Sequence, residues 1–116
     1  MPQLDIGHLQ LPAEQLHTLQ SLLAQCVPQA EVWAYGSRVS GTAHEGSDLD
    51  LVLRNPADLS ADVDHWADLQ EALQNSSLPI LVEAHLWSRL PAAFHANIAA
   101  AYIVLQAGAN PSQAAE

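Results

Sequence analysis

The sequence contains no lysine and only three arginines, against thirteen acidic residues, so its 116 residues carry a formal net charge of −10. Phosphate recognition depends on clustered Lys and Arg, so this balance argues against independent binding to nucleic acid. It disfavours an anionic membrane surface for the same reason. An acidic surface suits a basic partner instead, including a basic protein.

Cysteine and long apolar runs are also scarce. Cys26 is the only cysteine, which excludes an intramolecular disulfide and a Cys-rich zinc site. No segment reaches about 18 consecutive apolar residues, and the N-terminus lacks the basic start and apolar stretch of a secretory signal. Since 49% of the residues are hydrophobic, a core is affordable. We therefore expect a cytoplasmic protein, with a single domain over residues 1–107 and a flexible tail over 108–116.

The spacing of apolar residues, and the Pro and Gly residues that interrupt it, divide the chain into alternating helices and strands. They predict helix over 11–26, strand over 31–35, one or two helical turns over 37–41, strand over 48–54, helix from the N-cap Ser60 to about Leu73, strand over 80–87 and helix over 90–106. This α-β-α-β-α-β-α order predicts an α/β (α+β) fold, with a small mixed sheet of three or more strands backed by helices.

Two acidic residues lie close together on the strand predicted over 48–54. Asp48 and Asp50 leave the same face, with Cα atoms about 6.5–7 Å apart, while Leu49, Leu51 and Leu53 point the other way. Two unpaired carboxylates on one face repel each other, and a hard cation such as Mg²⁺ removes that conflict. The spacing also permits two carboxylates to bridge ions about 3.5–4 Å apart, as phosphoryl transfer with two metals requires.

A glycine and a serine come directly before this acidic strand's loop. Gly36 closes one strand and Ser37 opens a helical turn, which offers backbone N–H groups and a hydroxyl to a phosphate without lysine. Arg38 could add a charge-assisted contact, or could simply cap or pair with an acid. A metal-binding face beside a phosphate-binding turn is what nucleotidyl transfer from a triphosphate requires.

These residues resemble the signature of a known superfamily. Gly36-Ser37-Arg38, Gly41 and Ser47-Asp48-Leu49-Asp50-Leu51 are similar to the motif of the DNA polymerase beta-type nucleotidyltransferases. More narrowly, residues 11–106 resemble the minimal nucleotidyltransferase (MNT-domain) antitoxins that are paired with HEPN-domain ribonuclease toxins. The resemblance implies the polymerase beta-like fold and transfer of AMP from ATP-Mg²⁺ to a hydroxyl. In the antitoxin branch the acceptor is a tyrosine of the toxin, which is thereby neutralised.

The resemblance also implies roles for individual residues. Asp48 and Asp50 would hold two Mg²⁺ ions, and Glu83 would complete the metal site and help ionise or orient the attacking hydroxyl. These three carboxylates are thus the predicted catalytic and metal-binding residues. The family usually has Asp where this chain has Glu83, and His85 shares the face of Glu83. Nucleotide binding would fall to Gly36, Ser37, Arg38 and Ser47.

Two other functions remain open from the sequence. The chain could be a catalytically impaired nucleotidyltransferase scaffold that neutralises its toxin by stoichiometric binding, with Glu83 marking the lost activity. It could also be a small-molecule nucleotidyltransferase whose second subunit supplies the acceptor pocket. Its shortness and its acidic charge favour a folded, basic acceptor, because opposite charges steer two proteins together.

Overall fold

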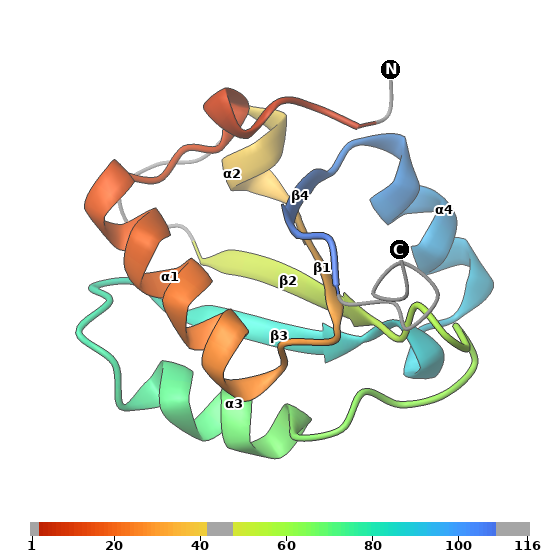
Figure 1. Ribbon diagram of the computed structural model, residues 1–116. Coiled ribbons are helices and arrows are strands. Elements are labelled where there is room, and N and C mark those ends of the chain that lie inside the picture. The colour runs from red at the N-terminus through yellow and green to blue at the C-terminus, as the bar shows by residue number, and fades with distance from the viewer. Residues whose placement is uncertain (1–2, 42–47, 109–116) are drawn as a thin grey trace, which may run out of the picture.

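The computed structural model describes residues 3–41 and 48–108, which form one sheet with helices on both faces (Figure 1). Its elements in chain order are η1 (Ile6–His8), α1 (Ala13–Cys26), β1 (Glu31–Tyr35), α2 (Ser37–Ser40), β2 (Leu49–Arg54), α3 (Trp66–Gln74), β3 (Val82–Leu86), η2 (Trp87–Arg89), α4 (Ala92–Ala100) and β4 (Ile103–Gln106).

The four strands lie in the order β3-β2-β1-β4. β1 is antiparallel to both β2 and β4, whereas β2 and β3 are parallel. Helices α1 and α3 cover one face of the sheet and α4 covers part of the other (Figure 1). The mixed sheet confirms the predicted fold class, and β1 has the predicted bounds.

Alternation along β2 and β3 separates a buried face from a polar one. The alternate leucines of β2 and the alternate apolar residues of β3 are buried in the core under α1 and α3, as predicted, and include Leu49, Leu51, Leu53, Val82, Ala84 and Leu86. Because side chains alternate along a strand, Asp50 and Glu83 leave the opposite face. A smaller cluster of Trp33, Val52 and Ile98 under α4 fills part of that second face.

The predicted helix over 90–106 is wrong in its second half. Helix α4 ends at Ala100, and Ile103–Gln106 forms a fourth strand that pairs with β1. Ile103 and Leu105 are buried while their neighbours are only partly so, which is the two-residue period of a strand. The β-branched pair Ile103 and Val104 also favours a strand. The Gln106 side chain fixes the strand's end by donating to the carbonyls of Val27 and Ala30.

The prediction that Ser60 begins a helix is also wrong. Helix α3 begins at Trp66, and Ser60 lies in a turn where its N–H and its hydroxyl both donate to Asp58 Oδ1, at 3.0 and 2.6 Å. Such local side-chain bonds compete with helix formation.

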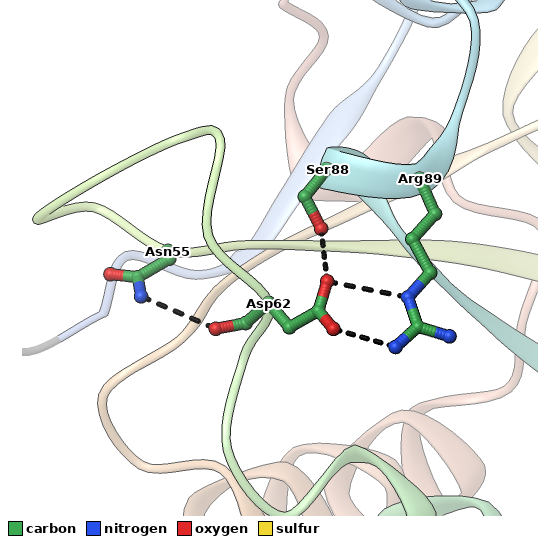
Figure 2. A network of polar contacts seen from close by, with 4 residues as sticks. All are labelled: Asn55, Asp62, Ser88 and Arg89. Carbon is green, nitrogen blue, oxygen red and sulfur yellow. Dashed lines mark hydrogen bonds and ion pairs between the residues drawn. The ribbon is translucent and has the colours of Figure 1, made fainter.

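Asp62, two residues further along the same segment, joins it to η2. Its carboxylate accepts hydrogen bonds from Ser88 and Arg89 while its backbone carbonyl accepts one from Asn55 (Figure 2). These contacts keep residues 60–65 in a non-helical connection, so helix α3 begins only at Trp66.

Strand β3 lies at the edge of the sheet, and α3 covers its exposed backbone. Trp66 Nε1 donates to the carbonyl of Ala84 at 2.8 Å. The backbone N–H of Ala84 in turn donates to Gln70 Oε1 at 3.3 Å. An edge strand whose backbone groups are satisfied in this way cannot add a further strand there. The two bonds also fix the position of the segment that carries Glu83 and His85.

Two predictions fall wholly or partly outside the described residues. Ser47 and, apart from Gly108, the predicted tail over 108–116 belong to segments that the structure does not describe. Within the described ranges, every helix is too short or too polar to cross a bilayer. The cytoplasmic location stays a prediction.

Candidate active site

Three polar residues line up across the adjacent strands β1, β2 and β3. Tyr35 on β1 pairs with Asp50 on β2, and Asp50 pairs with Glu83 on β3. Residues in register on one face of a sheet have neighbouring side chains. The sheet thus brings together two of the three predicted carboxylates, Asp50 and Glu83, and adds a tyrosine that the sequence motif did not indicate.

The environment of Asp50 opposes a negative charge. Burial raises the pKa of the Asp50 carboxyl, and the nearby charges of Glu83 and, to a smaller extent, Asp48 raise it further, while His85 acts in the opposite direction. Two close carboxylates that both ionise repel each other unless a cation lies between them. This is the electrostatic condition expected of a cation site.

Asp50, Glu83 and His85 form a compact group of potential metal ligands. One ligand atom from each residue lies within 4.8 Å of the other two, and His85 Nε2 is 3.8 Å from Glu83 Oε2. Two carboxylates and an imidazole suit a divalent cation. Asp48 is exposed immediately before β2 and does not belong to this group, so its role as a metal ligand stays a prediction.

Gly36 lies directly beside the carboxylates. It follows β1 with φ +91° and ψ −159°, a conformation that side chains disfavour. A Cβ placed on Gly36 would lie 2.8 Å from Asp50 Oδ2, closer than real Cβ contacts allow. The backbone angle favours glycine at this turn, and a side chain there would displace the Asp50 carboxylate oxygen.

A pocket of about 390 Å³ opens next to this turn. It lies between the end of β1 and helix α4 and is lined by Tyr35, Gly36, Ser37, Phe94, Asn97, Ile98 and Ala101. Burial, with the charges of Asp50 and Glu83, raises the pKa of Tyr35 to about 12. Its hydroxyl therefore stays protonated at neutral pH and can donate a hydrogen bond.

Arg38 has a structural contact that the sequence did not indicate. Its side chain is 7% exposed and donates from Nη1 to the Gln10 carbonyl at 2.6 Å, while the Gln10 N–H donates to the Arg38 carbonyl. These contacts tie the segment before α1 to α2. The nucleotide-binding role predicted for Gly36, Ser37, Arg38 and Ser47 stays a prediction.

Sequence reasoning missed the residues of α4 that line the pocket. Phe94 is 49% exposed and lines the pocket together with Asn97. The available signal was a pair of polar residues, His95 and Asn97, in an otherwise apolar helix. Tyr35 could have been found from its position directly before Gly36.

Comparison with known proteins gives consistent matches. Residues 3–95 match the family model described as "Poly(A) RNA polymerase, mitochondrial-like, central palm domain". A protein of Haemophilus influenzae named "Probable protein adenylyltransferase MntA" is 37% identical over 102 residues, which cover 86% of each chain. A chain from a crystal structure of a toxin-antitoxin with AMP-PNP has a similar fold, with a TM-score of 0.64 and 18% identity, over 86% of this chain and 78% of that one.

Proposed function

Since the chain belongs to the family of the mitochondrial-like poly(A) RNA polymerase central palm domain and is a nucleotidyltransferase, we propose that it is an antitoxin that transfers AMP from ATP to a hydroxyl of its cognate toxin. The relative named as a protein adenylyltransferase supports AMP as the group transferred and a protein as the acceptor. The similar fold of a toxin-antitoxin chain fits this proposal. In the reaction, the acceptor hydroxyl loses its proton and bonds to the α-phosphorus of ATP, and pyrophosphate leaves.

The observation that carries the proposal is the close approach of the Gly36 turn to Asp50, which pairs in register with Glu83. Asp50 and Glu83 are in register on neighbouring strands, and the turn at Gly36 approaches Asp50 so closely that a Cβ on Gly36 would lie 2.8 Å from Asp50 Oδ2. A triphosphate bound at this turn would thus lie beside the residues that hold a cation. Positioning and neutralisation of charge supply most of the catalysis of phosphoryl transfer.

The carboxylates of Asp50 and Glu83 are oxygen donors of the kind that divalent ions such as Mg²⁺ and Mn²⁺ bind. We propose that Asp50 and Glu83 hold one ion, and that Asp48, at the exposed start of β2, contributes to a second. Bound Mg²⁺ would neutralise the charge that develops on the phosphates. Glu83 is 46% exposed in its side chain, so it can accept a proton from an acceptor hydroxyl that approaches from solvent.

The pocket between β1 and α4 offers a place for the nucleoside of ATP. Phe94 and Tyr35 provide aromatic surface and Asn97 provides an amide, which suit a purine ring and its polar edge. Gly36 and Ser37 line the same pocket and would contact the phosphates between the purine and the carboxylates. This arrangement gives ATP and the cation a place on the chain and leaves the acceptor hydroxyl to come from a partner.

Charge supports a basic protein as that acceptor. The chain has three arginines and no lysine. Arg54 pairs with Glu31 at 2.7 Å, Arg89 pairs with Asp62 at 2.6 Å, and the buried Arg38 side chain binds the Gln10 carbonyl. A site so poor in available cations would gain from a positively charged partner. We propose a HEPN-domain ribonuclease toxin as the partner and a tyrosine as the acceptor.

The test is to incubate the protein with ATP, Mg²⁺ and the toxin encoded beside it, and to measure the intact mass of the toxin. We expect a gain of one or more AMP groups and loss of ribonuclease activity. The Asp50→Asn variant should transfer no AMP, whereas Glu71→Gln, on exposed α3, should behave as the wild type. A toxin that is inhibited without any gain in mass, by the wild type and Asp50→Asn alike, would instead establish stoichiometric capture.

A further inference from the structure

His85 stands beside the carboxylate pair. It lies two residues beyond Glu83 on β3, so both side chains leave the same face of the strand. Its Nε2 atom is 3.8 Å from Glu83 Oε2, and its ligand atom lies within 4.8 Å of that of Asp50 as well.

We propose that His85 is a nitrogen ligand of the cation held by Asp50 and Glu83, and that this site therefore prefers Mn²⁺ to Mg²⁺. The inference rests on the proposed function, because it concerns the same cation. Mg²⁺ strongly prefers oxygen ligands, whereas imidazole favours first-row transition ions, of which Mn²⁺ accepts mixed oxygen and nitrogen ligands. Replacing one carboxylate of a three-oxygen set by an imidazole shifts the preference in that direction.

The spacing argues against a simpler role in which His85 only orients Glu83. A separation of 3.8 Å is too long for a hydrogen bond, but it suits two ligands of one ion. His95 shows the contrast. Its Nε2 lies 2.7 Å from the Trp87 carbonyl, and its ring stacks on Trp87 with centroids 3.8 Å apart, so its ring is already engaged in the fold.

The strand also holds Glu83 and His85 in a fixed relation. Ala84, which lies between them, is bonded on its outer side by Trp66 and Gln70 of α3. On its inner side β3 is paired with β2 along its whole length. A pair of ligands on a strand anchored from both sides can bind an ion with little loss of backbone freedom.

The test is pulsed electron paramagnetic resonance of Mn²⁺ bound to the full chain. Inorganic tripolyphosphate replaces ATP, so that the protein is the only source of nitrogen. We expect modulation from imidazole ¹⁴N in the wild type and in His17→Ala, whose histidine is exposed on α1. It should disappear in His85→Ala. Calorimetry should show Mn²⁺ affinity falling about tenfold or more in His85→Ala, as for loss of a metal-site residue, and Mg²⁺ affinity falling less.

The outcomes separate this inference from the proposed function. Mn²⁺ that binds without imidazole modulation, and that is lost in Asp50→Asn, would overturn the role of His85 and leave the proposed carboxylate site standing. A wild-type protein that binds neither Mn²⁺ nor Mg²⁺ with tripolyphosphate present would overturn both. The variant His85→Asp provides a further check, because a third carboxylate should bring Mg²⁺ affinity closer to that for Mn²⁺.

Discussion

Gly36 and Asp50 are neighbours across the sheet, although the loop between their elements separates them in sequence. A Cβ on Gly36 would meet Asp50 Oδ2 at 2.8 Å. This approach joins the turn after β1 to the carboxylate on β2. The geometry of the candidate site therefore depends on a residue that has no side chain.

Replacing Gly36 should damage both folding and catalysis. Gly36→Ala adds a methyl group against Asp50 and forces alanine into a backbone region reserved for glycine, so we expect a loss of about 1–3 kcal/mol in the free energy of unfolding. AMP transfer should be lost in the fraction that remains folded. Urea unfolding and the toxin mass assay measure the two effects.

Gly41→Ala is the matched control for that variant. Gly41 also has a positive φ, of +88°, but a Cβ there would meet nothing within 4 Å. The free energy of unfolding of Gly41→Ala should fall by the same amount as in Gly36→Ala or by less, through backbone strain alone. Gly41→Ala should keep AMP transfer. Equal loss of transfer in both variants would show that strain, rather than contact with Asp50, explains the effect.

Removing the charge of Asp50 should stabilise the protein while it abolishes transfer. Because the pKa of Asp50 is raised in the fold, ionisation opposes folding as pH rises from its ordinary value of 3.8 through the raised one. Asp50→Asn should thus melt at an equal or higher temperature at pH 7. Mg²⁺ or Mn²⁺ should raise the melting temperature of the wild type only. A lower melting temperature for Asp50→Asn in the absence of metal would contradict this account.

The contribution of the Asp62 network to stability should depend on pH in the opposite direction to that of Asp50. Hydrogen bonds from Arg89 and then Ser88 lower the pKa of the Asp62 carboxyl below its usual 3.8. Its contribution to stability is therefore complete above pH 3.8 and is lost as the pH falls through the lowered value. A double-mutant cycle of Asp62→Asn and Arg89→Gln, followed from pH 7 to pH 2, should show a coupling that disappears in acid. A coupling that persists at pH 2 would exclude the ion pair as its source.

The bond from Trp66 should support the edge strand. Trp66→Phe keeps most of the packing but leaves the Ala84 carbonyl without this donor, so we expect a loss of about 1 kcal/mol in unfolding free energy. Because Ala84 lies between Glu83 and His85, cation affinity measured by calorimetry should fall as well. An unchanged affinity at reduced stability would show that the strand keeps its position without the tryptophan.

The sequence was most informative where burial imposes a strict period. The alternate leucines of β2 fixed its buried face, and so placed Asp50 on the other face correctly. The spacing of apolar residues did not distinguish helix from strand over the last predicted element, because an alanine-rich apolar segment is compatible with both. Pairing of Ile103–Gln106 with β1 makes its second half a strand. The prediction that Ser60 begins a helix was wrong because the Ser60 N–H donates to the side chain of Asp58 in a local turn.

The candidate site was predictable in its residue types more than in its arrangement. Alternation put Glu83 on the correct face, but the register that sets it against Asp50 depends on long-range pairing. The motif implied Asp48 as a metal ligand, which stays a prediction, whereas the position of His85 beside Asp50 and Glu83 became visible only in the structure. The pocket lining from α4 depends on how that helix packs over the sheet, which no local pattern specifies.

The proposed activity requires that Asp50 and Glu83 hold a cation beside the Gly36 turn. The most direct measurement is a crystal structure with Mn²⁺ and a non-hydrolysable ATP analogue, with the metal located by its anomalous scattering. We predict an anomalous peak bonded to carboxylate oxygens of both Asp50 and Glu83, with the triphosphate against Gly36. A nucleotide bound elsewhere, or a metal that contacts neither carboxylate, would contradict it.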